Sequence, residues 1–307
     1  MNTMQNQNTL PGTEVGIDEI VSSLVKVKLT IGCSGGKVRA NELSKETAQA
    51  HGASERDIST SVKWMAKEYR ALLGGVNSRL RTAFNSRTLP WEDGGYRVVP
   101  AAQYSALCDA VAEAGEAFRK VGQDIADRWD DILAEAKTRL NGAFGKLDIP
   151  TRDEFIRAQH YSMNSDVVTA TADMRIEGLG EATVERIRKQ AEANYAERIE
   201  NAVAGMLADL TNLLTDLVAR CDKDKQKGTR YEGWAGWAKR TVKFMRPLNL
   251  TNDSRLTQML DRVQALADEV GKDADMSLFD SDPLTLFAKP LLVVGDGEIL
   301  MEGKPNA

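Results

Sequence analysis

Two long stretches of this chain carry apolar residues in steps of three and four positions, and this spacing constrains the fold more than any other feature. They are residues 101–147 and residues 184–221. Such spacing predicts an α-helix with one apolar stripe. If the first stretch is continuous, its 47 residues span about 70 Å and need a partner of similar length. We therefore predict that the two helices pack on each other, with an interface that includes Leu107, Val111, Phe118, Ile125, Ile132, Leu140, Ile187, Ile199, Met206 and Leu213.

Shorter patterns surround these stretches. Residues 24–31 alternate apolar residues with Lys and Thr, which predicts a half-buried strand. Residues 163–176 are rich in Val, Thr, Ser and Asp, and we expect them to pair with that strand in a small sheet. We also expect a helix from Ser54 to Ala83, a short strand at 95–99, a helix after the capping box of Thr151 and Glu154, a helix at 254–270 and a hairpin at 291–301.

The predicted fold is mainly α. We expect an elongated antiparallel helical hairpin or bundle of long, coiled-coil-like helices, with a small β element at one end. Residues 1–16 are interpreted as a disordered tail and residues 17–225 as the long-helix core domain. Residues 226–307 then hold a C-terminal basic-aromatic segment, a helix and a short hairpin.

Composition limits the classes of partner and the cellular location that we expect for the chain. Its 307 residues carry a formal net charge of −5, so no overall positive field favours nucleic acid or a membrane surface. No run of about 18 apolar residues occurs, which predicts no membrane span and no membrane partner. The three cysteines, Cys33, Cys108 and Cys221, are odd in number and far apart. We therefore expect reduced thiols and a cytoplasmic location.

No catalytic or metal-binding constellation is present in the sequence pattern. Residues 32–37, Gly-Cys-Ser-Gly-Gly-Lys, follow the predicted strand and can be compared with a phosphate-binding loop. Ile31 stands where that loop needs a glycine, and Val38 stands where it needs Ser or Thr. Only two histidines occur and no cysteine has another nearby, so close metal ligands are lacking. We predict no enzyme, no cofactor and no metal site, and interpret residues 32–37 as a turn.

The most distinctive polar segment is residues 223–246. It holds eight Lys or Arg against Asp224 and Glu232, a net charge of +6, so the remainder of the chain carries −11. Its interleaved aromatic residues suit either a nucleic acid or an acidic face on a protein partner. Alternatively, Trp234, Trp237 and Phe244 lie in the core and the lysines are solvated. The candidate contact residues are Lys223, Lys225, Lys227, Arg230, Tyr231, Trp234, Trp237, Lys239, Arg240, Lys243 and Arg246.

A glycine-rich turn precedes the second long stretch. Gly178, Leu179 and Gly180 resemble the turn of the helix-hairpin-helix family, which presents backbone amides to a DNA phosphate. A helix N-terminus supports such a contact because it carries free N–H groups and partial positive charge. This turn is therefore a candidate phosphate contact. The alternative is an ordinary glycine-rich start of a helix.

The order of elements resembles an uncharacterised family from phages, prophages and integrative elements, known as domain of unknown function 3150. The resemblance rests on residues 24–31, on the long stretch that contains Arg128-Trp129-Asp130, on the mixed segment 155–176 and on the second long stretch. It covers about residues 20–225 and leaves the basic-aromatic segment outside. The family implies a gene near those of MoxR-type AAA+ ATPases and von Willebrand factor A-like proteins. It implies no catalytic residues.

Two functional hypotheses follow. The first is a non-enzymatic phage or mobile-element protein, in the cytoplasm of a bacterial host cell, that self-associates or docks a protein partner through its long helices. If the resemblance holds, that partner is a AAA+ ATPase. The second is a DNA- or RNA-binding protein in phage replication, recombination or counter-defence, which uses the basic-aromatic segment and the turn at Gly178.

Overall fold

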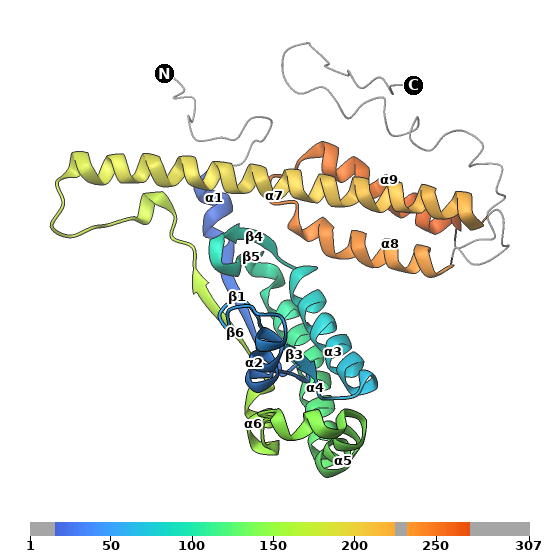
Figure 1. The fold of residues 1–307 in the computed structure, drawn as a ribbon. Helices are drawn as coiled ribbons and strands as arrows, with labels where there is room; N and C mark the ends of the chain where they lie inside the picture. The colour runs from blue at the N-terminus through green and yellow to red at the C-terminus, as the bar shows by residue number, and fades with distance from the viewer. Residues whose placement is uncertain (1–15, 225–231, 271–307) are drawn as a thin grey trace, which may run out of the picture. The chain divides into compact units, whose positions relative to one another are not determined.

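The computed structural model describes residues 16–224 and 232–270 (Figure 1). The chain divides into two compact units, one formed by Val21–Met174 and the other by the residues from Arg175 onward together with those up to Ile20. Helix α1 (Ile17–Ser22) lies at this division, and the expected domain of residues 17–225 spans both units. Residues 1–15 of the expected tail at 1–16 and the expected hairpin at 291–301 lie outside the described residues.

The unit Val21–Met174 is built on a four-stranded antiparallel sheet. Its strands, in spatial order, are β4 (Leu89–Glu92), β5 (Tyr96–Pro100), β1 (Leu24–Gly32) and β6 (His160–Val167). Helix α3 (Lys67–Asn85) lies between β1 and β4 in the chain, and helix α4 (Tyr104–Asp127) lies between β5 and β6. This succession of strand, helix, two strands, helix and strand, with this spatial order, is the ferredoxin-like topology.

Alternation in the sequence located the central strand correctly. The strand expected at residues 24–31 is β1, and the short strand expected at 95–99 is β5. The pairing expected between residues 163–176 and β1 is confirmed for the first part of that segment. Strand β6 pairs with β1 from Val25 opposite Val167 to Gly32 opposite His160.

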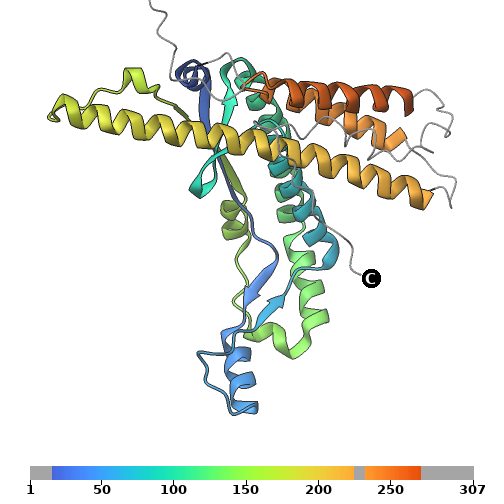
Figure 2. The same ribbon diagram turned by 90° about the horizontal axis from the view of Figure 1, so that it is seen from above.

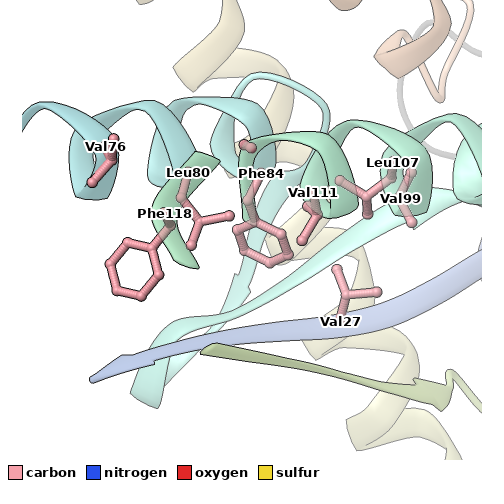
Figure 3. Packing of buried hydrophobic residues seen from close by; sticks show 9 residues of the cluster. Val27, Val76, Leu80, Phe84, Val99, Leu107, Val111 and Phe118 are labelled. Carbon is pink, nitrogen blue, oxygen red and sulfur yellow. The ribbon is translucent and has the colours of Figure 1, made fainter. Parts of the chain in front are cut away.

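Helices α3 and α4 cover the same face of the sheet. Val27 of β1 and Val99 of β5 belong to one buried cluster with Leu80 and Phe84 of α3 and Phe118 of α4. Figure 3 shows these side chains pointing into the layer between helices and strands. A sheet that has one apolar face needs such a cover, which explains why both helices carry an apolar stripe.

Two insertions extend this core. Between β1 and α3 the chain forms β2 (Lys37–Arg39), α2 (Asn41–Ala50) and β3 (Ser61–Lys63). Between α4 and β6 it forms α5 (Trp129–Leu140) and α6 (Arg152–Ala158), and the expected capping box starts α6. A second buried cluster joins the insertions, with ring centroids 5.3 Å apart for Trp64 and Trp129 and 5.0 Å apart for Trp129 and Phe155.

The helix expected to begin at Ser54 is wrong in its first part. Residues 61–63 form β3, in which Val62 pairs with Val38 of β2, and α3 begins only at Lys67. Ile58, Val62 and Met65 have helical spacing. Pairing with a distant strand overrides this local pattern, because burial in a ladder stabilises an extended backbone that the local sequence does not require.

The first long stretch is not one rod. It divides into a 3₁₀ turn (Ala101–Gln103), α4, α5 and another 3₁₀ turn (Asn141–Lys146). The backbone departs from helical values at Arg128, with φ −105° and ψ 22°, and Asn141 ends α5 with φ 48°. After the first break the Trp129 ring reaches the second cluster.

In the other unit, the described residues from Arg175 onward form the α-helices α7 (Glu181–Asp224), α8 (Glu232–Met245) and α9 (Ser254–Val270). The second long stretch is confirmed as continuous helix, and Figures 1 and 2 show α7 as an uninterrupted rod. Its partners within this unit are α8 and α9. Met206, Leu210 and Leu214 are buried among the described side chains in the C-terminal half of α7.

The predicted fold class is therefore wrong. The protein is a mixed α/β protein, and the described residues contain no elongated coiled-coil bundle. The expected seam residues fall in two units: Leu107, Val111, Phe118, Ile125 and Ile132 are buried in the sheet-containing unit, whereas Ile199 and Met206 are buried on α7. Spacing of three and four positions indicates a face to be buried and does not specify whether a helix or a sheet buries it.

Candidate interaction face on helix α8

The inner side of α8 is lined by small residues. Ala235, Ala238 and Val242 are buried, and their spacing of three and four places them on one side of the helix. Leu256, Leu260 and Val263 of α9 are buried as well, and α8 and α9 are in extensive contact. Small side chains allow the two helices to approach closely. The basic-aromatic segment therefore contains a helix with one side packed on α9 and another side that faces away from it.

Two cations, Lys239 of α8 and Arg246 directly after the end of α8, are paired with α9. Lys239 Nζ lies 2.7 Å from Asp268 Oδ1, and Arg246 Nη2 donates to Asp261 Oδ1 at 2.7 Å. The two bases are seven residues apart, and so are the two acids, as expected for an antiparallel pair of helices. These side chains are partly exposed, so each pair contributes modestly to stability. Their role is to fix which side of α8 faces α9.

The outer side of α8 combines an exposed indole with two cations. Trp237 is 43% exposed, and Arg240 and Lys243 are exposed three and six residues further along. Successive steps of three positions place Arg240 beside both neighbours on the helix surface. Among the residues that the structure describes, Arg240 and Lys243 form no ion pair. We call Trp237, Arg240 and Lys243 the outer α8 face.

The side chain of Asp253 caps the start of α9, the helix that packs on α8. Asp253 precedes α9, and its Oδ1 accepts the backbone N–H groups of Arg255 at 2.8 Å and Leu256 at 3.3 Å. Its other oxygen accepts from the Arg255 guanidinium at 2.6 Å. The hydrogen bond from Arg255 is the main reason why the pKa of Asp253 is lowered. This is an N-cap, and it fixes the start of the helix that supports α8.

The predicted contact residues thus separate into three groups. Lys239 and Arg246 pair with α9, whereas Trp237, Arg240 and Lys243 form the outer α8 face. The structure contradicts the alternative of a buried Trp237, since this residue is 43% exposed, whereas Phe244 is half-buried. The remaining candidates have side chains outside the described part of the chain: Lys223, Lys225, Lys227, Arg230, Tyr231 and Trp234.

The acidic partners on α9 were missed by the sequence reasoning. A usable signal was present, because Asp261 and Asp268 repeat the seven-residue separation of Lys239 and Arg246. For the other expected residues, Leu140 and Ile187 are only half-buried, and the side chain of Leu213 lies outside the description.

The turn at Gly178 lacks the first helix of a helix-hairpin-helix. Gly178 has φ 82°, which a glycine adopts readily, and Leu179 is 44% exposed before α7 begins at Glu181. The elements before it are β6 and a 3₁₀ turn (Thr171–Asp173). Gly178, Leu179 and Gly180 therefore form a glycine-rich start of one long helix, in keeping with the alternative interpretation.

A second mixture of basic and aromatic side chains lies on the sheet. Lys26 and Lys28 of β1 lie 5.3 and 4.7 Å from the centroid of the Tyr96 ring, on the face away from α3 and α4. Lys26 also pairs with Asp166 of β6 at 3.4 Å. Both lysines therefore have partners within the sheet, which leaves the outer α8 face as the stronger candidate site.

Among residues 16–224 and 232–270, no group of three or more His, Cys, Asp or Glu side chains is arranged to hold a metal ion. No helix in the same residues is long and apolar enough to cross a membrane.

Comparison with known proteins adds no relative: no family model, no curated protein and no solved structure matches this chain.

Proposed function

We propose that this chain is a non-enzymatic interaction protein that docks an acidic protein partner through the outer α8 face. The observation that carries the proposal is that the cations on α8 and directly after it fall into a paired and an unpaired group among the described residues. Lys239 and Arg246 are engaged by α9, whereas Arg240 and Lys243 stand beside the exposed Trp237 without an ion pair in the described residues. Trp and Arg are the residues that most often anchor protein interfaces.

The chemistry of the face selects the partner. An indole flanked by cations binds a surface that presents an apolar pocket rimmed by carboxylates. The resemblance to domain of unknown function 3150 supplies one specific candidate, a MoxR-type AAA+ ATPase encoded nearby. On the same basis we propose a phage or mobile element as the source and the host cytoplasm as the setting.

Affinity capture with matched variants tests this proposal. The wild-type chain, Trp237→Ala and the double variant Arg240→Glu/Lys243→Glu are each used as bait, with the neighbouring AAA+ ATPase and a lysate of the source cells as prey. The matched control is Arg186→Glu/Lys189→Glu, because these residues are an exposed Arg and Lys with the same three-residue spacing on α7.

We expect an acidic partner to be retained by the wild type and the control, and its retention to fall about tenfold or more with both α8 variants. Raising the salt concentration should weaken capture, since charge steers this contact. A partner that is retained equally by all four baits, or no specific partner, would contradict the proposal.

Single-stranded nucleic acid is the second candidate ligand. The exposed Trp237 beside Arg240 provides a surface on which a base can stack. The two cations of this face, Arg240 and Lys243, neutralise few phosphates, so the affinity would have a shallow salt dependence, with a slope of about −1.4 for a single strand. This small number, together with the −11 charge of the remainder of the chain, is why we rank a protein partner first.

Fluorescence polarisation with 30-nucleotide DNA and RNA strands, at 50 and 200 mM salt, distinguishes the two ligands. Binding at 50 mM salt that Trp237→Ala abolishes would replace the protein partner by nucleic acid. No binding at 50 mM salt would exclude this second function, because phosphate contacts are strongest there.

A further inference from the structure

The two edges of the four-stranded sheet differ in how they are protected. The edge strand β4 has four residues, contains Pro90 and shows a register shift between Pro90 and Glu92. The edge strand β6 has eight residues and pairs with β1 without interruption. Short length, proline and irregularity prevent an edge from pairing with another chain. Strand β4 carries all three of these devices, and β6 carries none.

Charged side chains on β6 are few. Its one carboxylate is Asp166, which pairs with Lys26 of β1 and also accepts the backbone N–H of Val167 at 2.9 Å. The strand contains no Lys or Arg. The outer edge of β6 therefore carries one carboxylate, Asp166, which occupies the backbone N–H of Val167. In the part of the chain that the structure describes, no strand pairs with the rest of this edge.

The side chains of β6 alternate between two faces. Tyr161, Met163, Ser165 and Val167 stand opposite Ile31, Leu29, Val27 and Val25, on the side of α3 and α4. Ser162, Asn164 and Asp166 lie on the other side, as the alternation requires. Val167 is 75% exposed, the largest value among the exposed large apolar residues that the structure describes. A further strand that paired with this edge would cover the exposed side chain of Val167.

We propose that β6 pairs in antiparallel fashion with β6 of a second copy of this chain, about a two-fold axis through Asn164. This register places Tyr161 opposite the partner subunit's Val167 and Ser162 opposite the partner subunit's Asp166. Each exposed Val167 thereby gains an aromatic neighbour, a hydroxyl group meets each carboxylate, and no like charges face each other. The two sheets become one eight-stranded sheet with the helices of both copies on one face.

The self-complementary pattern is the reason for choosing a second copy over a foreign strand. A two-fold axis repeats every contact of the interface once in each copy. A single register therefore places Tyr161 of one copy beside Val167 of the other in both copies. A shift that centres the axis on Met163 leaves Val167 opposite Gln159, beyond the end of the strand. The interface is small, so we expect dissociation at roughly micromolar concentration.

The charge test uses Asn164→Glu in the full-length chain. Within one copy the new carboxylate stands beside Lys28, its neighbour in β1, so the fold tolerates it. Across the two-fold axis it meets the same carboxylate of the second copy and repels it. Thr138→Glu, at an exposed position of α5, is the matched control.

Analytical ultracentrifugation between 1 and 100 μM gives the masses. We expect the wild type and Thr138→Glu to approach twice the 33.7 kDa of one chain, and Asn164→Glu to remain at 33.7 kDa, with dimerisation weakened tenfold or more. A wild-type chain that stays monomeric throughout, or an Asn164→Glu dimer of unchanged affinity, would overturn the proposal.

A cysteine at the axis tests the register. Asn164→Cys faces its own counterpart and should form a covalent dimer under mild oxidation, whereas Ser162→Cys faces Asp166 and should cross-link no more than the wild type. Equal cross-linking of both variants would refute this register. The outer α8 face takes no part in this pairing, so the dimer should persist in Arg240→Glu/Lys243→Glu. The two proposals can therefore fail independently of each other.

Discussion

Residues 101–147 and residues 184–221 carry the same apolar spacing and fold differently. The first stretch breaks at Arg128 and Asn141, and its α4 part covers a sheet. The second stretch is a single helix that packs on α8 and α9. The comparison teaches that a stripe with steps of three and four determines which side of a helix is buried. The distant residues that meet the stripe determine its partner and its length.

The largest expected effect comes from truncating the stripe where it meets the sheet. Phe118 is fully buried among residues of β1, β5 and α3, so Phe118→Ala should cost about 3–5 kcal/mol of unfolding free energy. Leu210→Ala is the counterpart on α7, also fully buried, with an expected cost of about 2–5 kcal/mol.

Hydrogen exchange measured by mass spectrometry separates the two effects. Phe118→Ala should speed exchange in β1, β5 and α3, and Leu210→Ala should speed it in α8 and α9. If truncation of Phe118 also released α8 and α9, the two stripes would share one core and the comparison would fail.

A glycine in α4 gives the next largest effect. The ring of Tyr161 in β6 lies against the backbone at Gly115, and a methyl group there would overlap it. Gly115→Ala should therefore destabilise the sheet-containing unit by about 1–3 kcal/mol, although alanine favours helix. Urea unfolding followed by circular dichroism measures it. An unchanged midpoint would mean that Tyr161 is not held against α4.

Removing the Asp253 side chain tests the N-cap of α9, the helix that packs on α8. Asp253→Ala removes the N-cap of α9 and should cost about 0.5–2 kcal/mol at pH 7. Because the pKa of Asp253 is lowered in the folded state, its contribution is complete above the ordinary value of about 3.9 and is lost as the pH falls through the folded value. The difference between wild type and variant in urea unfolding should therefore shrink below about pH 4. A difference that is constant from pH 7 to pH 3 would argue against the cap.

The smallest effect should have the opposite sign. Gly205 lies within α7, and a methyl group there would meet no atom within 4 Å among the described residues. Gly205→Ala should stabilise the protein by about 0.5–1 kcal/mol, because glycine loses more conformational freedom in a helix than alanine. Thermal unfolding measures the shift. Glycine-to-alanine substitution should therefore lower the unfolding free energy at Gly115, in the first stretch, and raise it at Gly205, in the second.

Much of the candidate site could be foreseen. The sequence identified Trp237, Arg240 and Lys243 as contact residues, since cations and aromatics interleave in residues 223–246. It could not separate them from Lys239 and Arg246. That separation depends on Asp261 and Asp268, which reach α8 only because α9 folds back against it.

By itself, the sequence determined the local features of this protein: the alternating strand β1, the capping box before α6, the uninterrupted helix α7 and the helix α9. These follow from forces between residues close in the chain. Only the tertiary structure decided that Val62 joins a strand, that the first long stretch breaks at Arg128, and that β1 lies between β5 and β6. Burial stabilises contacts between residues far apart in sequence, and local periodicity carries no information about which distant residues meet.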